Sequence, residues 1–408
     1  MALAPAGAYA VRRSLPRSAL GENFRRVCAD GSAHQMHGCP DGSLSWRERV
    51  ANTEDAKPGW LARLRGAPAA VENAAAEPAP GRRRAEEEAI ELELTILDAQ
   101  HHFADDSQPP FTMPDLLTVL RTNGHRIVGT IFVEAGFRYR PDGPEELRPV
   151  GEVEAVRTLA ESADRTHPGL GPCRGIVGHA DLILGDRVAG VLDALATAAG
   201  GRLCGIRDVA AWDADPRFRF GPPFGAPAGM LLDDRFQAGV QRLERYDLVF
   251  NATVFGPQLP ELATLARACP STRIVVEHAG LPLWVRQDLS RDAVLETWRS
   301  NLAELASLPN VFMKIGNLPQ QRSFFVDHGP GSDVLAAAWR PYIDACVDAF
   351  SPERSMLESD LTVQAALCNY TVLWNAFKKA TAHYAPTERE FLFHRTALAV
   401  YGLDGAAL

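Results

Sequence analysis

Eight short apolar runs recur along the chain, with segments of helical spacing between them, and this alternation limits the possible folds more than any other feature. The runs cover residues 95–103, 127–135, 175–182, 205–212, 248–255, 274–280, 311–318 and 356–363. Helical spacing marks residues 188–199, 259–269, 295–308 and 334–350. Strands that alternate with helices predict the α/β class and a (β/α)8 TIM barrel. A doubly wound open sheet also alternates, but no glycine-rich phosphate loop follows any of the runs.

Polar side chains gather near the ends of these apolar runs. They are Gln100, His102, Glu134, His179, Asp181, Arg207, Asp208, Asn251, Thr253, His278, Lys314 and Asp360. In a TIM barrel the carboxyl ends of the strands form one ring, where active sites are built. An apolar residue would serve the barrel equally well, so the ring predicts a functional site. For His179 and Asp181, which share one face, we expect ordinary hydrogen bonds between loops.

The first run closes with Asp98-Ala99-Gln100-His101-His102. Alternate side chains of a strand share a face, so the side chains at 100 and 102 point together and His101 points away. A neutral imidazole is a good zinc ligand, whereas the amide oxygen of a glutamine is a weak one. Gln100 therefore bears directly on whether a metal is held here.

Residues 1–90 differ in composition from the remainder. Ala, Gly, Pro and Arg dominate, and residues 67–84 lack aromatic and most β-branched side chains. We expect a low-complexity, flexible N-terminal arm and linker over 1–90 and one barrel domain over 91–408. Cys28, His34, His37 and Cys39 could form a zinc knuckle, but their spacing fits no standard finger, and we do not expect a metal there.

Charge and cysteine content argue against several classes of protein. The formal net charge of −9 disfavours nucleic acid as a partner, because phosphate binding needs clustered positive charge. The seven cysteines are odd in number and widely scattered, which favours reduced thiols and a cytoplasmic location. No apolar run approaches the roughly 18 residues of a membrane helix, so we expect no membrane partner.

Nine motifs in order along the barrel region carry a family resemblance. They are Asp-Ala-Gln-His-His (98–102), Phe-Val-Glu-Ala (132–135), Gly-Ile-Val-Gly-His-Ala-Asp-Leu (175–182), Gly-Ile-Arg-Asp (205–208), Trp-Asp-Ala-Asp-Pro (212–216), Pro-Gln-Leu-Pro-Glu-Leu (257–262), Val-Glu-His-Ala-Gly (276–280), Met-Lys-Ile-Gly (313–316) and Glu-Ser-Asp (358–360). By these motifs the chain resembles the metal-dependent amidohydrolase superfamily. Within it, the chain is similar to the amidohydrolase-2 branch of TIM-barrel lactonases and decarboxylases, such as 2-pyrone-4,6-dicarboxylate lactonase-like hydrolases.

The resemblance implies functional positions for His102, His278 and Asp360, with Asp360 as the carboxylate that activates water. This chain departs from the family pattern where Gln100 replaces the first ligand His and Asp208 replaces a His that often follows Gly-Ile-Arg. Some lactonases of this branch work without a metal. The resemblance therefore leaves two options open: no required cofactor, or one weakly bound divalent ion, zinc or manganese, on His102, His278 and Asp360.

Lactone hydrolysis needs a base that deprotonates water and donors that stabilise the oxyanion. Asp360 is the predicted base, and the structural alternative is an Asp that caps the following turn. His102 and His278 would donate to the substrate carbonyl or ligate a metal. The structural alternative for each histidine is a buried core residue with satisfied hydrogen bonds.

Substrate binding is expected to involve Arg207, Lys314, Glu134 and Gln100. Arg207 and Lys314 could clamp a substrate carboxylate, which would indicate a carboxylated lactone, or they could pair with acids inside the barrel mouth. The Pro/Gly-rich loop after the fourth run contains several aromatic side chains. This loop could cover the substrate, pack on the barrel rim, or contact another subunit of a homo-oligomer.

Together these observations predict a hydrolase of the lactonase type that acts on a small molecule. Two alternatives stay open. One is a decarboxylase or lyase on the same barrel. The other is a catalytically inactive paralogue with a binding or scaffolding role. It is indicated by Gln100 and Asp208 together with Gly256, which ends the Val-Phe-Gly segment before Pro257 where similar family members tend to carry Tyr-His.

Overall fold

The computed structural model describes residues 85–105, 110–220, 224–282, 290–318, 329–364 and 368–403. Within them a parallel sheet of eight strands runs in the order β1 to β8, and each strand is hydrogen-bonded to the next. The strands are β1 Thr95–His101, β2 Arg126–Val133, β3 Gly175–His179, β4 Leu203–Arg207, β5 Val249–Ala252, β6 Ile274–Val276, β7 Val311–Ile315 and β8 Ser355–Leu357. Each lies in one of the eight predicted runs or overlaps it, so the (β/α)8 barrel is confirmed.

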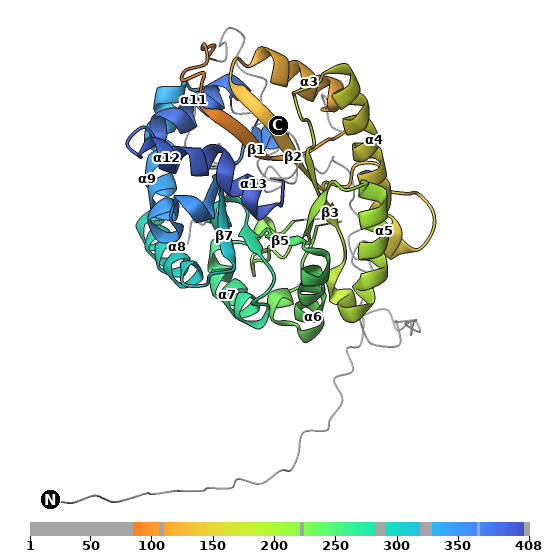
Figure 1. Ribbon diagram of the computed structural model, residues 1–408. Coiled ribbons are helices and arrows are strands. Elements are labelled where there is room, and N and C mark those ends of the chain that lie inside the picture. The colour runs from red at the N-terminus through yellow and green to blue at the C-terminus, as the bar shows by residue number, and fades with distance from the viewer. Residues whose placement is uncertain are drawn as a thin grey trace, which may run out of the picture. The chain divides into compact units, whose positions relative to one another are not determined.

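Helices follow the strands along the chain, and most of them surround the barrel on its outside (Figure 1). They are α3 Met113–Thr122, α4 Val150–Thr166, α5 Ala189–Ala199, α6 Asp234–Arg242, α7 Leu259–Ala268, α8 Arg291–Ala306, α9 Ser332–Phe350, α10 Leu361–Gln364, α11 Tyr370–Ala380, α12 Pro386–Glu390 and α13 Thr396–Val400. The predicted helix at 295–308 begins earlier in the structure, because the Ser290 side chain accepts a hydrogen bond from the backbone N–H of Ala293 and caps α8.

Alternate strand residues point inward and outward, as the period of a strand requires. In β6, Val275 belongs to the apolar cluster inside the barrel, whereas Ile274 and Val276 belong to the larger cluster between strands and helices. In β5, Val249 and Phe250 divide in the same way. Both faces of the sheet are therefore buried, which explains why the strands read as continuous apolar runs.

The C-terminal helix covers one end of the barrel, where α13 lies over the strands in Figure 1. Leu398, Tyr401 and Leu403 pack in the same cluster as the inward-facing residues of the strands. The Tyr401 hydroxyl donates to the Asn251 side chain of β5 at 3.2 Å. One mouth of the barrel is thus filled by the end of the chain, and the other mouth holds the polar ring.

The first and last strands are joined by side-chain hydrogen bonds. The Ser359 backbone N–H, just after β8, donates to the Asp98 carboxylate of β1 at 2.9 Å. The Thr362 hydroxyl donates to the carbonyl of His102 and accepts from its N–H. This seam brings the residues that follow β1 and β8 next to each other.

The described part begins at residue 85, so most of the predicted arm, with the Cys28, His34, His37 and Cys39 set, lies outside it. The segment 85–94 lies along α11: the Lys378 ammonium donates to the carbonyls of Ile90 and Glu91 at 2.8 and 2.9 Å. Among the residues that the structure describes, no helix has the length and apolar character needed to cross a membrane.

Candidate active site

A pocket opens at the carboxyl ends of the strands, where the polar ring was predicted. It encloses about 330 Å³, open solvent included, and is lined by His102, Arg207, Val209, Phe220, Thr253, His278, Leu281, Asn317, Asp360 and Val363. One part of this lining is polar and the other is apolar. A few polar groups set among apolar side chains in a cleft are typical of sites that bind small organic molecules.

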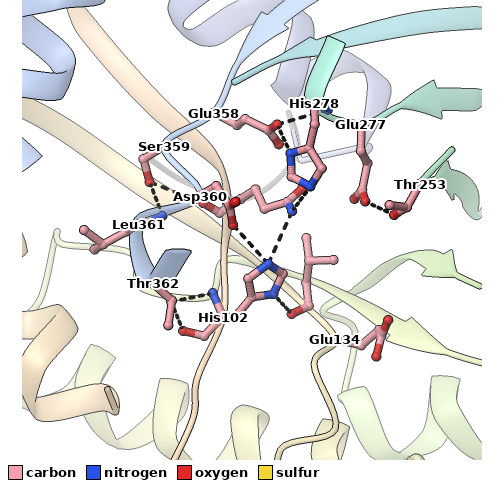
Figure 2. Close-up of polar contacts among 12 residues, drawn as sticks. His102, Glu134, Thr253, Glu277, His278, Glu358, Ser359, Asp360, Leu361 and Thr362 are labelled. Carbon is pink, nitrogen blue, oxygen red and sulfur yellow. Dashed lines mark hydrogen bonds and ion pairs between the residues drawn. The ribbon is translucent and has the colours of Figure 1, made fainter. Parts of the chain in front are cut away.

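His102 follows β1 and is almost completely buried, with 1% of its surface exposed. Its Nδ1 donates to the backbone carbonyl of Val133 at 2.7 Å, which leaves Nε2 to face the pocket. That Nε2 lies 3.2 Å from a carboxylate oxygen of Asp360, as Figure 2 shows. Residues from the first and last strands therefore meet at one point.

His278 follows β6 and has a carboxylate behind its ring. The Glu358 carboxylate accepts from Nδ1 at 2.7 Å and also from the His278 backbone N–H at 3.2 Å (Figure 2). Burial lowers the pKa of the His278 imidazole, but the charge of Glu358 outweighs burial and raises it to about 9. The ring is thus held in one orientation, with Nε2 toward the pocket.

The Gln100 carboxamide lies between the two histidines. Its Nε2 is 3.3 Å from Nε2 of His102 and 3.3 Å from Nε2 of His278. The predicted shared face of positions 100 and 102 is confirmed by this contact. His101 points away and contacts the Thr130 hydroxyl at 2.9 Å. An amide NH₂ group donates to an imidazole nitrogen only where that nitrogen presents its lone pair.

Asp360 is buried, with 1% of its surface exposed. Burial raises the pKa of this carboxyl, but the His102 imidazole and the Arg207 guanidinium act in the opposite direction and lower it below its ordinary value. Apart from the His102 contact, neither oxygen has a hydrogen-bond partner among the described residues. An unused buried carboxylate in a pocket can accept a proton from a ligand or from water.

Arg207 and Lys314 are fully buried and paired with acids. Arg207 Nε donates to Glu134 at 2.8 Å, and its Nη1 lies 3.4 Å from Glu277. The Lys314 ammonium is 3.6 Å from Glu277 and 3.9 Å from Glu358. Burial would raise the pKa of Glu277, but Arg207 and Lys314 together lower it well below its usual range. Both cations are therefore largely neutralised by the protein itself.

Backbone strain coincides with the pocket. His278, Asn317 and Asp360 have φ values of 57°, 49° and 45°, in the left-handed region that residues with side chains rarely adopt. Each follows the end of a different strand and lines the pocket. Such conformations persist only where the surrounding structure enforces them, and they cluster at functional sites.

The apolar wall of the pocket comes from loops that follow the strands. Phe220, in the long loop after β4, stacks on Phe255 with ring centroids 5.7 Å apart and planes 12° from parallel. Val209, Leu281 and Val363 line the same pocket. Part of the Pro/Gly-rich loop therefore reaches the site.

Most of the predicted site residues lie at this pocket or next to it, but only some of them line it. His102, Arg207, His278 and Asp360 line the pocket. Gln100 and Glu134 contact these residues without lining the pocket, and Lys314 contacts Gln100. His179 and Asp181 make local hydrogen bonds, His179 to the Arg207 carbonyl and Asp181 with the Ile183 N–H.

Sequence reasoning assigned no role to Glu277 and Glu358. Both are fully buried acids beside the predicted His278 and Asp360 in the chain. Charged residues at the ends of otherwise apolar strands were the available signal. Their partners come from other strands, so the sequence alone did not pair them.

Comparison with known proteins agrees with this architecture. Residues 97–403 match the sequence profile of the amidohydrolase family, so the chain belongs to that family. The uncharacterized protein y4mH of Sinorhizobium fredii is 27% identical over 330 residues, which are 76% of this chain and 99% of that protein. An L-fucono-1,5-lactonase of Burkholderia multivorans is 30% identical over 191 residues, which are 43% of this chain and 59% of the lactonase.

Two crystal structures of an amidohydrolase from Burkholderia multivorans share the fold, each with a TM-score of 0.56 and coverage of 76% of this chain and 99% of theirs. The one that contains HEPES is 25% identical to this chain, and the one that contains zinc is 23% identical.

The arrangement of donors in this chain does not fit a divalent ion. Within the described residues no group of three His, Cys, Asp or Glu side chains forms a metal-binding cluster. The place between His102 and His278 is taken by the NH₂ group of Gln100, which is a donor and not a ligand. The amide oxygen, which could ligate, instead accepts from Lys314 at 3.1 Å.

Proposed function

We propose that the protein is a hydrolase that opens a lactone, with Asp360 activating the attacking water. The observation that carries this proposal is a buried carboxylate at the pocket whose pKa is lowered and whose oxygens are almost free of donors. Membership of the amidohydrolase family and the similarity to an L-fucono-1,5-lactonase support this reaction class.

Groups that line the pocket can accept and return the proton that the reaction transfers. Asp360 accepts a proton from water, and the resulting hydroxide forms the new C–O bond at the lactone carbonyl. His102 Nε2, 3.2 Å from Asp360, can share this proton while the tetrahedral intermediate exists. The ring C–O bond then breaks, and Asp360 returns the proton to the leaving alkoxide, which regenerates the carboxylate.

Arg207 is the proposed donor to the oxyanion. Its contacts with the Glu134 carboxylate, the Glu134 carbonyl and Glu277 use one N–H on each of its three nitrogens. A guanidinium carries five N–H groups, so two remain for a ligand. The two acids hold the guanidinium in a fixed orientation, which lowers the cost of reorganisation in the transition state.

The charge around the pocket favours an uncharged lactone over a carboxylated one. Four buried acids, Glu134, Glu277, Glu358 and Asp360, stand against two buried cations, Arg207 and Lys314. Both cations already have carboxylate partners, so neither is available to pair with a carboxylate of the substrate. The apolar wall with Phe220 suits the C–H face of a sugar ring or an alkyl chain.

The test is a panel of uncharged and carboxylated lactones, with acid release followed by a pH indicator. Wild-type protein is expected to hydrolyse uncharged lactones with a kcat/KM at least ~10-fold above that for carboxylated ones. Asp360→Asn should lower kcat by ~10²- to 10⁴-fold, because only the proton acceptor is lost. Asp233→Asn, at the partly exposed N-cap of α6, is the matched control, since Asn caps a helix as well as Asp does.

Two outcomes would overturn the proposal. Release of carbon dioxide from a carboxylated aromatic, without lactone turnover, would indicate the decarboxylase alternative. Equal inactivity of wild type and Asp360→Asn over the whole panel, with both proteins folded, would indicate a binding role.

A further inference from the structure

We propose that the Gln100 carboxamide replaces a metal ion as the group that holds His102 and His278 together, and that Lys314 fixes its orientation. This inference does not depend on the substrate or on the reaction. It rests on three contacts: the amide nitrogen at 3.3 Å from each imidazole Nε2, and the amide oxygen at 3.1 Å from the Lys314 ammonium.

Lys314 determines which way the amide faces. An ammonium has three donors and no acceptor, so it can contact only the oxygen of the carboxamide. The NH₂ group must then face the two histidines. Lys314 is itself held by Glu277 and Glu358, and it is fully buried. The orientation therefore follows from the charges below the site and does not depend on solvent.

The Nδ1 contacts of the two histidines agree with this orientation of the amide. The Nδ1 of His102 faces a carbonyl, which only accepts, and the Nδ1 of His278 faces the Glu358 carboxylate. Each Nδ1 therefore carries a hydrogen, and in the neutral ring each Nε2 has a lone pair. The two hydrogens of the amide NH₂ group match these two lone pairs.

A divalent ion would need the same lone pairs. Zinc binds imidazole nitrogen at ~2.0–2.1 Å, and a lone pair cannot serve an ion and an amide hydrogen at once. The ion would also lie near the Lys314 ammonium, which repels it. Gln100 thus forms two weak hydrogen bonds to the histidines and brings no positive charge. An ion in its place would form two strong bonds and would bring positive charge. Gln100 is a positioning residue in this account, because it acts through the two imidazoles.

Metal content tests the proposal without any need for turnover. Full-length wild type, Gln100→His and Gln241→His are incubated with zinc chloride, desalted and analysed for zinc. Gln241 lies on the exposed side of α6, so this variant controls for an added surface histidine. We expect Gln100→His to retain about one zinc per chain and to bind it at least ~100-fold more tightly than wild type or Gln241→His.

A second measurement needs no variant at the site itself. Imidazole ¹⁵N spectra of wild type near neutral pH, with and without zinc, report the tautomers of His102 and His278. We expect Nδ1 of both rings to carry a hydrogen and neither Nε2 signal to change on addition of zinc. Stoichiometric zinc in wild type, with shifted Nε2 signals, would overturn the proposal. If Gln100→His fails to fold, these spectra still decide the question.

Discussion

Gly316 lies so close to Glu358 that no side chain fits between them. A β-carbon at position 316 would be 2.1 Å from Cγ of Glu358 and 2.5 Å from its carbonyl oxygen. Glu358 in turn accepts the hydrogen bond that orients His278. The lack of a side chain at the end of β7 therefore sets the position of an imidazole that follows β6.

Gly316→Ala is expected to lower both stability and activity. The added methyl group must displace Glu358, which costs ~1–3 kcal/mol of unfolding free energy as overpacking. Loss of the Glu358 contact also releases His278, so kcat should fall at least ~10-fold. Urea denaturation and lactone turnover measure the two effects. Gly190→Ala, in α5 with open space around it, is the control and should raise stability by ~0.5–1 kcal/mol. Equal behaviour of the two variants would contradict the close packing.

Asp98 predicts a pH dependence of stability. Burial raises the pKa of this carboxyl to about 6, against the hydrogen bonds from Ser359 and Tyr370. A carboxyl whose pKa is higher in the folded state stabilises the fold below its unfolded value and loses that contribution as pH rises. Between pH ~4 and ~6 this group should remove ~2–3 kcal/mol of unfolding free energy. Urea denaturation of wild type and Asp98→Asn across this range isolates it, because the variant cannot ionise. The same slope in both proteins would assign the effect to other groups.

Arg207→Lys tests the oxyanion role. A lysine keeps the charge but cannot contact Glu134 and Glu277 while donating to a ligand in a fixed geometry. We expect kcat to fall by ~10²- to 10³-fold with a smaller change in KM. Arg267→Lys, in the exposed pair with Glu304, is the control and should leave both constants unchanged. An increase in KM alone would mean that Arg207 binds substrate equally in the ground and transition states.

Phe220→Ala tests the apolar wall. Loss of the ring that stacks on Phe255 should raise KM ~10-fold, because apolar contact with the substrate is removed, and should leave kcat close to wild type. Phe218→Ala changes a phenylalanine of the same loop that does not line the pocket, and it should leave KM unchanged. A similar rise in KM for both variants would indicate a general effect on the loop.

The fold was predictable because local pattern and global architecture agree. Both faces of each strand are buried, so the eight strands appear as apolar runs, and alternation with helices leaves few topologies. Helix ends were less predictable. The N-terminus of α8 depends on the Ser290 cap, which precedes the apolar spacing that marks the helix.

The positions of the site residues in a ring at the strand ends were predictable, but the contacts among their side chains were not. Residues at strand ends could be named, because the carboxyl ends of parallel strands meet. The pairing of these residues could not be predicted, because the acids that Arg207 contacts are far from it in the chain. Glu134 is 73 residues away and Glu277 is 70 residues away. Which acid neutralises each of the two cations depends on side-chain directions that only the folded barrel defines.

The seam between β1 and β8 has a consequence for biosynthesis. Its Ser359–Asp98 contact joins residues 261 positions apart, and Asp360 reaches His102 only across this seam. A ribosome must therefore release almost the whole domain before Asp360 can meet His102, and a nascent or prematurely terminated chain lacks this pair. Until then the edge of β1 has no neighbour on that side, so the interval between synthesis of the first and last strands is when this chain is most exposed to aggregation.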